Sequence, residues 1–431
     1  MIATIFVSVV TSILLVLSIV FIPKIKIGHL FLDTYWIVAL IGAIILFVFD
    51  LLDLKEVIKA LLSDGVMNPI KIVILFLSMS VLSLFLDEIG FFRYIASWVH
   101  QRTKSKQLPV FLSLYLVISV LTIFTSNDII ILTFTPFLCY FAKNAKINPI
   151  PYLVMEFIAA NTWSMLLVIG NPTNIYLASM YQIDFLLYLQ KMFVPTLLAG
   201  IGSFILMLIL FRKNLQKPME QVLDKVAIKN KLLFTVGMIH LLLCTVFLAI
   251  SNYIGLEMWL ISFGFAVSLF VFLLLFKKKS SEFYLPIVVK RMPWSLMPFV
   301  ISMFLIVLGL SKYQVTNSLL EFFNNFPTIY SFGLFSFLFS NLINNIPMSV
   351  LFAEIIQPLS ALTLEKALFA SIIGSNVGAF LTPVGALAGM MWMGMLKKES
   401  INFGFKTFIR TNSLLALASI ILALVGLMIV F

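Results

Sequence analysis

The chain has 431 residues, of which 62% are apolar and 11% are charged, whereas a typical soluble domain is about 45–50% apolar and about 25% charged. Its 29 Lys and Arg residues outnumber its 18 Asp and Glu residues, but the aromatic residues lie inside apolar runs rather than between basic residues, so we expect no nucleic-acid partner. Two isolated cysteines, Cys139 and Cys244, indicate neither a disulfide framework nor a thiolate metal cluster. The composition therefore predicts an all-α polytopic membrane protein that is not an enzyme and has no cofactor or metal site.

Membrane-spanning helices are the first elements that the sequence predicts. A bilayer core of about 30 Å needs about 20 apolar residues of helix. The first such run has neither a basic segment before it nor a small-residue cleavage site after it, so we expect a membrane helix rather than a signal peptide. Ten runs of suitable length lie at roughly 2–22, 30–52, 69–89, 152–180, 192–211, 232–250, 256–276, 293–310, 366–396 and 410–431.

Two further apolar segments, about 109–142 and 328–357, are each too long for one helix. Polar residues interrupt them midway, at Ser126-Asn127-Asp128 and at Asn344-Asn345-Ile346-Pro347. We predict that each is a re-entrant helical hairpin, because non-helical backbone at membrane depth is tolerated only inside protein or along an aqueous cavity. Two ordinary spans joined by a very short turn are the alternative.

The basic residues give an orientation. If neither hairpin crosses the membrane, the loops at 23–29, 90–108, 143–151, 212–231, 277–291 and 397–410 share one side and contain 23 of the Lys and Arg residues. The positive-inside rule makes that side cytoplasmic. We therefore expect a multi-pass protein of the cell membrane with both termini outside.

The order of elements indicates an internal repeat. Residues 1–211 and residues 232–431 each contain five predicted transmembrane helices and one hairpin, and the basic linker 212–231 joins them on the cytoplasmic side. Because five crossings is an odd number, the second repeat has inverted topology. Many secondary transporters have this organisation and hold their substrate near the midplane.

Each repeat also contains a predicted broken helix, at about 152–180 and about 366–396. The expected breaks are at Gly170 and Pro172 in the first repeat, and run from Gly374 to Pro383 and Gly385 in the second. Proline removes an amide donor and glycine relaxes the backbone, so Pro172 and Pro383 are expected to tolerate substitution poorly.

A single interruption would indicate a structural kink. Four interruptions in matching places instead predict a binding site for a small inorganic or small polar solute. Its predicted binding residues are Ser126, Asn127, Asn171, Thr173, Asn174, Asn344, Asn345, Ser375, Asn376 and Thr382.

Asp128 is the acidic residue at a hairpin tip, and we predict that it binds the coupling ion, a proton or a sodium ion. The alternative is that its carboxylate only caps the following helix. Glu156 and Glu257 are expected at the surface. Asp87 and Glu88 are expected to form interfacial ion pairs beside Arg93, and Glu354 is a weaker candidate close to the outer surface.

No Lys or Arg lies near the predicted centre, which disfavours a multiply charged anion neutralised by a guanidinium group. A neutral, hydroxyl-rich solute or a small cation fits better. An anion held by helix N-termini together with bound cations stays open.

These residues resemble the arsenite permease family of the ion transporter superfamily, over about residues 70 to 410. The matching segments are Leu86 to Phe92, Ser126-Asn127-Asp128, Pro293-Trp294, Asn344-Asn345-Ile346-Pro347 and Thr382-Pro383-Val384-Gly385-Ala386-Leu387-Ala388. The resemblance implies a substrate domain, formed by the hairpins and broken helices, that moves against a scaffold domain able to form a homodimer. It also implies efflux of arsenite or antimonite against protons.

The sequence departs from those permeases at Gly170-Asn171-Pro172-Thr173-Asn174, which is closer to the wider superfamily's Gly-x-Pro-x-Asn pattern. The substrate therefore stays open between arsenite and the alternatives, a sodium/proton antiporter or a citrate/dicarboxylate anion symporter. No Gly-x4-Gly-Lys-Ser/Thr motif is present, so any ATP hydrolysis would belong to a separate ATPase subunit, which the family analogy allows.

Overall fold

The computed structural model describes residues 2–22, 24–27, 30–62, 68–95, 106–220, 228, 230–251, 253–276 and 284–431. Parts of the predicted loops 23–29, 90–108, 212–231 and 277–291 lie outside these described residues. The described part is almost entirely helical, and eight of its helices are long and apolar enough to cross a membrane. The chain is thus an all-α polytopic membrane protein.

The first half starts with a small feature that the hydrophobic pattern did not predict, an antiparallel pair of strands where the second apolar run begins. Lys24 is the register partner of Asp33, and their side chains form an ion pair of 3.5 Å. The elements are α1 (Ile2–Phe21), β1 (Lys24–Ile27), β2 (Leu30–Asp33), α2 (Thr34–Val48), α3 (Leu54–Leu62), α4 (Pro69–Glu88), α6 (Gln107–Phe124), α7 (Asn127–Asn144), α8 (Ile150–Trp163), the 3-10 turn η1 (Val168–Gly170), α9 (Pro172–Met180) and α10 (Phe185–Leu215).

The second half repeats this order of long helices, two-helix hairpin, broken helix and closing helix. Its elements are α11 (Lys231–Ala249), α12 (Met258–Phe276), α13 (Leu285–Arg291), α14 (Leu296–Lys312), α15 (Val315–Phe323), α16 (Thr328–Ile343), α17 (Asn345–Ile356), α18 (Ala361–Gly378), the 3-10 turn η2 (Pro383–Gly385), α19 (Leu387–Lys398) and α20 (Phe405–Val430). With 16 and 12 residues, α16 and α17 are shorter than the roughly 20 residues that a straight crossing needs.

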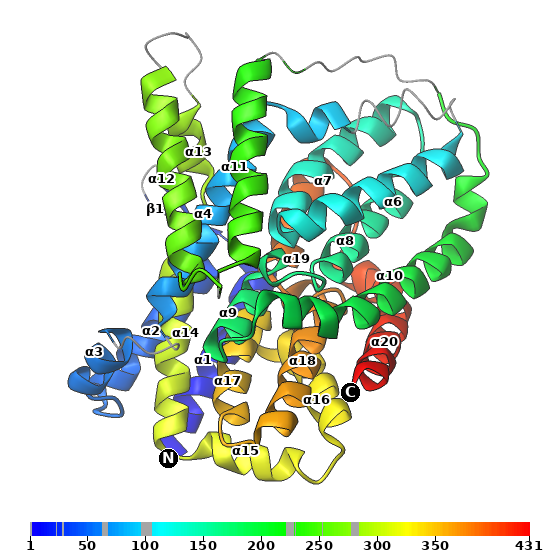
Figure 1. Cartoon of the computed structure of the whole chain (residues 1–431). Coiled ribbons are helices and arrows are strands. Elements are labelled where there is room, and N and C mark those ends of the chain that lie inside the picture. The colour runs from blue at the N-terminus through cyan, green and yellow to red at the C-terminus, as the bar shows by residue number, and fades with distance from the viewer. Residues whose placement is uncertain are drawn as a thin grey trace.

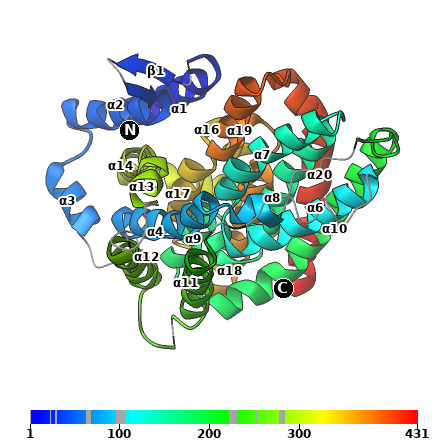
Figure 2. The same ribbon diagram turned by 90° about the horizontal axis from the view of Figure 1, so that it is seen from above.

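Long helices of each half pack against long helices of the other half. Helix α4 of the first half packs on α12 of the second, and α14 of the second half packs on α2 of the first. Figure 2 shows these helices with α1, α11 and α13 on one side of the molecule, and the hairpins and broken helices with α10 and α20 on the other. We call the first group the scaffold helices and the second group the hairpin bundle.

Ion pairs connect the scaffold helices at their ends. Lys71 of α4 lies 2.8 Å from Glu257, which is exposed as expected and precedes α12. Arg291 of α13 lies 2.6 Å from Asp87 and 2.7 Å from Glu88. The expectation that Asp87 and Glu88 form ion pairs is therefore confirmed. Arg291 of α13 supplies the guanidinium group, and Arg93 also has an electrostatic interaction with Asp87.

The hairpin bundle is held together by close helix packing (Figure 1). Helix α18 packs on α16, and α10 packs along α20. A Cβ on Gly374 would lie 1.8 Å from Ser336 Oγ, and one on Gly378 would lie 2.8 Å from the Phe337 carbonyl oxygen. These glycines let α18 approach α16 closely, as small residues do in membrane helices.

Candidate functional site

The tip of the first hairpin is anchored to α8. Ser126 has an extended backbone and caps α7, with its Oγ accepting a hydrogen bond of 3.4 Å from the Ile129 amide. The Asn127 side-chain amide donates to Asn161 Oδ1 of α8 at 3.0 Å. The Asn127 Oδ1 atom is buried without a hydrogen-bond partner, so it is available to a donor from a solute.

The tip of the second hairpin is anchored to the second break. Asn344 joins α16 to α17 at φ 75° and ψ 153°, a region that is nearly exclusive to glycine. Its side-chain amide donates to the Val384 carbonyl at 2.9 Å. Asn341 Oδ1 accepts from the Thr382 amide at 3.0 Å and from the Thr382 hydroxyl at 2.7 Å. Asn345 opens α17, and its carbonyl accepts a hydrogen bond from Ser349.

The first break begins earlier than predicted. Helix α8 ends at Trp163, Gly170 closes the turn η1, and Pro172 is the first residue of α9. A Cβ on Gly170 would lie 2.2 Å from the Ser164 carbonyl oxygen. The requirement for glycine is therefore steric.

The second break begins later than predicted. Helix α18 continues to Gly378, so Ser375 and Asn376 are helical, and the prediction that they lie in the interruption was wrong. Pro383 begins η2 and Gly385 ends it. A Cβ on Gly385 would lie 2.4 Å from the Gly378 carbonyl oxygen, much as at Gly170.

The first break and α18 share a hydrogen-bonded group of buried side chains. Asn376 Oδ1 accepts from the Ser164 hydroxyl at 3.0 Å and from the Asn171 amide at 2.9 Å, and its own amide donates to Asn174 Oδ1 at 2.7 Å. The Ser375 hydroxyl donates to Thr173 Oγ1 at 2.8 Å. We call these residues the central amide cluster: Ser164, Asn171, Thr173, Asn174, Ser375 and Asn376.

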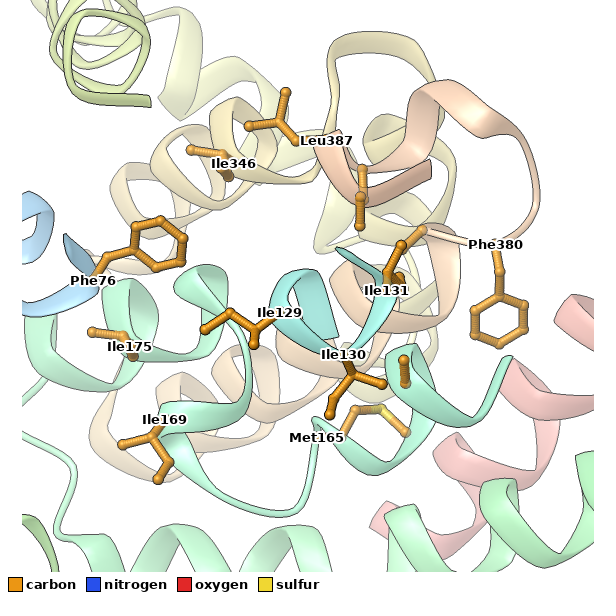
Figure 3. Close-up of a cluster of buried hydrophobic side chains, with 14 of the residues drawn as sticks. Phe76, Ile129, Ile130, Ile131, Met165, Ile169, Ile175, Ile346, Phe380 and Leu387 are labelled. Atoms are coloured by element: carbon orange, nitrogen blue, oxygen red, sulfur yellow. The ribbon is translucent and has the colours of Figure 1, made fainter. Parts of the chain in front are cut away.

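Asp128 is the second residue of α7 and is 8% exposed. No hydrogen bond or ion pair joins its carboxylate to another described residue, although it has an electrostatic interaction with the Tyr35 hydroxyl of α2. Ser126, and not Asp128, caps α7. The structure therefore does not support the alternative in which the Asp128 carboxylate is the capping group. Figure 3 shows the apolar surroundings of this helix start, which include Phe76, Ile129, Ile130, Ile131, Ile175, Ile346 and Leu387.

Glu156 was expected at the surface, and the structure contradicts this. Its side chain is fully buried, and the Thr135 hydroxyl of α7 donates to both carboxylate oxygens, at 2.8 and 3.1 Å. Helix α8 begins only at Ile150 and runs into the middle of the bundle, so its seventh residue already lies inside protein. Glu354 on α17 accepts a hydrogen bond of 3.1 Å from Ser311 of α14.

Sequence reasoning missed Asn161, Ser164 and Asn341. For Asn161 the sequence did contain a signal, namely its spacing from a glycine. Asn161 precedes Gly170 by nine residues (170 − 161), and Asn376 precedes Gly385 by nine (385 − 376). Since both glycines close a 3-10 turn, the two asparagines occupy matching places in the two halves.

A small cavity of about 20 Å³ lies where α9 and α17 meet α4 and α14, enough for about one water molecule. Thr173, Ser349 and Tyr176 contribute to its wall, and the Tyr176 hydroxyl is buried without a partner. A larger groove of about 450 Å³ between α1 and α2 has an almost wholly apolar wall. The small cavity borders the central amide cluster, and the large groove does not.

The side chains of the central amide cluster are all electrically neutral. Among the described residues, no Lys or Arg side chain forms a hydrogen bond or ion pair with a residue of the central amide cluster, with Asn127 or with Asp128. The site can donate to and accept from hydroxyl groups through its amides and hydroxyls.

The chain is similar to several known proteins. A family model described as "Citrate transporter" matches residues 34–374. The "Arsenical pump membrane protein" of Escherichia coli is 24% identical over 366 residues, which cover 82% of this chain and 84% of that protein. The protein of the same name from Yersinia enterocolitica is 25% identical over 367 residues, with the same coverage. The "46 kDa membrane protein" of Mycobacterium leprae is 24% identical over 374 residues, again with that coverage.

Proposed function

Because this chain belongs to the citrate transporter family and is a membrane transporter, we propose that it is a secondary active transporter that exports arsenite or antimonite in exchange for protons. The family name describes a group of related transporters. The chemistry of the site of this chain decides which solute it fits.

The observation that carries the proposal is the neutral chemistry of the central amide cluster. Trivalent arsenic and antimony exist at neutral pH as trihydroxides, which both donate and accept hydrogen bonds. Amide and hydroxyl side chains such as Asn171, Thr173 and Asn376 complement such a solute. A three-thiolate site is not available, since Cys139 on α7 and Cys244 on α11 are isolated from each other.

Citrate fits the same site poorly. A tricarboxylate needs compensating positive charge, typically from arginine, and the charged groups in this region, Asp128 and Glu156, are carboxyls. The relatives named arsenical pump membrane protein point in the same direction. A sodium/proton antiporter is the second candidate, favoured by Asp128, whose carboxylate forms no hydrogen bond or ion pair with another described residue and which a small cation would complement.

We assign the coupling ion to Asp128. An ionised carboxylate inside a membrane protein is costly unless something neutralises it. The start of α7 supplies only partial positive charge, so proton binding would remove the remaining cost. A proton on Asp128 and a solute on the neighbouring amides would then occupy the site in turn.

Transport requires the site to open. The cavity of about 20 Å³ has room for about one water, so a trihydroxide has to enter by a movement that parts α9 and α17 from the scaffold helices α4 and α14. Inverted repeats moving in this way would expose the site to each side alternately. We propose in addition that both termini lie outside, that the scaffold helices form a homodimer, and that a separate ATPase subunit can associate with the chain.

The test is transport by the purified chain in proteoliposomes. Arsenite, antimonite, sodium and citrate are offered under an imposed pH gradient and, separately, under a sodium gradient. We expect the pH gradient to drive uphill movement of arsenite or antimonite, with empty liposomes and an Asn376→Ala variant as controls. Uphill citrate movement under a sodium gradient would overturn the solute, and sodium flux alone would favour the second candidate.

A further inference from the structure

Glu156 lies at a junction between the two halves of the chain. It is on α8 of the first half, and its carboxylate receives the Thr135 hydroxyl of α7 at 2.8 and 3.1 Å. The Trp392 side chain of α19, from the second half, faces the same carboxylate, although its indole nitrogen makes no hydrogen bond of its own. Helix α7 also packs directly on α19.

The surroundings of this carboxyl are apolar and dry. Glu156 is fully buried, and so is the Trp392 ring. The Phe157 and Phe408 rings lie 5.0 and 5.7 Å from the Trp392 ring. Water therefore has no access to the carboxyl in this conformation.

No described cation neutralises Glu156. Helix α7 contributes the Thr135 hydroxyl and the Cys139 thiol, and the thiol also has an electrostatic interaction with Glu399 after α19. Among the described residues of the other packed elements α6, α10, α18 and α20, no charged group interacts with the carboxyl. One neutral donor does not compensate an ionised carboxylate in such a place.

We propose that Glu156 is a second proton-binding site of the transport cycle, separate from Asp128, and that it is occupied by a proton in this conformation. The inference rests on the proposed proton-coupled function. When α7 and α19 move away from α8, the carboxyl loses the Thr135 donor and its dry surroundings, and water reaches it. The O–H bond then breaks, the proton passes to water, and the carboxylate left behind is solvated until a proton from the other side rebinds.

The direct test is infrared spectroscopy of the purified chain in liposomes at neutral pH. A protonated buried carboxyl gives a carbonyl band separate from those of carboxylates and of the backbone. We expect this band in the wild type and a loss of intensity in Glu156→Gln. The matched control, Glu321→Gln, changes an exposed carboxyl on α15 and should leave the band unchanged. A band of unchanged intensity in Glu156→Gln would overturn the proposal.

A second variant keeps the test valid if Glu156→Gln does not fold. Thr135→Val nearly conserves shape but removes the hydroxyl, so we expect the band to remain and to shift in frequency. A band that neither shifts nor changes in Thr135→Val would show that it arises elsewhere and would overturn the assignment. These outcomes are independent of the proposed solute, because the spectra require no transport. A failed flux assay with the band present would refute the proposed function and leave the proton on Glu156 established.

Discussion

Asn171 in the first break and Asn376 in α18 are 205 residues apart in the sequence and are joined by a hydrogen bond of 2.9 Å. The bond connects the unwound part of one half to the helical segment α18 of the other. The central amide cluster therefore depends on both halves, and a change in either one alters the whole site.

Asn376→Ala should abolish transport and lower stability. It removes the Asn376 partner of the Asn171 side-chain amide and of Asn174 Oδ1, and an unsatisfied buried polar group costs about 1–3 kcal/mol. Thermal unfolding in detergent and solute flux measure the two effects. Asn325→Ala, at an exposed asparagine beyond α15, is the matched control and should resemble the wild type; equal effects of the two variants would contradict the role of the cluster.

Gly385→Ala and Gly170→Ala should each impair folding or transport, because the added Cβ would lie 2.4 or 2.2 Å from a backbone carbonyl oxygen. Gly394→Ala is the control. No atom lies within 4 Å of a Cβ at this position in α19, and alanine in a helix interior stabilises by roughly 0.5–1 kcal/mol. Thermal unfolding and flux of all three variants test this, and wild-type behaviour of Gly385→Ala would refute the steric argument.

The structure revises the expectation for the two prolines. Pro172 and Pro383 each begin a helical segment, where the missing amide has no helical partner in any case. We now expect Pro172→Ala and Pro383→Ala to affect flux less than the glycine variants do. A complete loss of flux in either proline variant, with normal folding, would restore the original expectation.

At the second hairpin tip, Asn344→Ala should be less stable than Asn344→Gly. Both variants lose the hydrogen bond to Val384, but only alanine keeps a Cβ at φ 75°. The backbone strain is worth about 1–3 kcal/mol. Thermal unfolding of the two variants side by side measures it, and equal stability would show that the tip relaxes.

Asp128→Asn should weaken the dependence of transport on the pH gradient while leaving solute exchange intact, because the amide keeps the shape but cannot release a proton, whereas Glu156 still can. Efflux from liposomes at several imposed pH gradients measures this. Asp53→Asn changes an exposed carboxyl before α3 and should keep the wild-type profile. If the Asp128→Asn variant still transports solute against its gradient with an unchanged pH profile, Asp128 does not bind the coupling proton. Glu156 and Glu354 are then the remaining candidates for that role.

The predicted orientation can be tested by cysteine labelling, since the native Cys139 and Cys244 are buried. Lys217→Cys lies in the basic linker and Lys55→Cys lies in α3, and both positions are exposed. An impermeant reagent added to right-side-out vesicles should label Lys55→Cys and spare Lys217→Cys. The reverse pattern would invert the topology.

The bounds of the two helix pairs agree closely with the predicted segments, because polar residues that interrupt a long apolar run indicate where two helices meet. The pairs occupy 107–144 and 328–356, against predicted segments of about 109–142 and 328–357. That each pair re-enters the membrane on one side stays a prediction. The short helices α3 and α15, the separate helix α13 and the strand pair were not predicted. These elements are amphipathic or short. Their apolar residues are continuous with those of the neighbouring spans, so the hydrophobic pattern does not separate them.

The residues that were misplaced are ones whose structure depends on tertiary packing, which a local sequence pattern does not contain. Ser375 and Asn376 remain helical because Gly374 allows α18 to lie against α16, and a local pattern contains no information about that partner. Glu156 was misplaced for a related reason. Its burial comes from α7 and α19, one before it and the other more than 200 residues after it in the chain.

The packing between the scaffold helices of the two halves also has a consequence for biogenesis. Helix α4 packs on α12, and α2 packs on α14. The first half therefore leaves the ribosome before the helices on which it packs have been synthesised. Until they are inserted, the faces of α4 and α2 that α12 and α14 cover in the finished fold are not covered by those helices. The nascent first half is therefore a stage at which quality-control proteases can recognise the chain, and a mutation in α12 or α14 would reduce its abundance without touching the site.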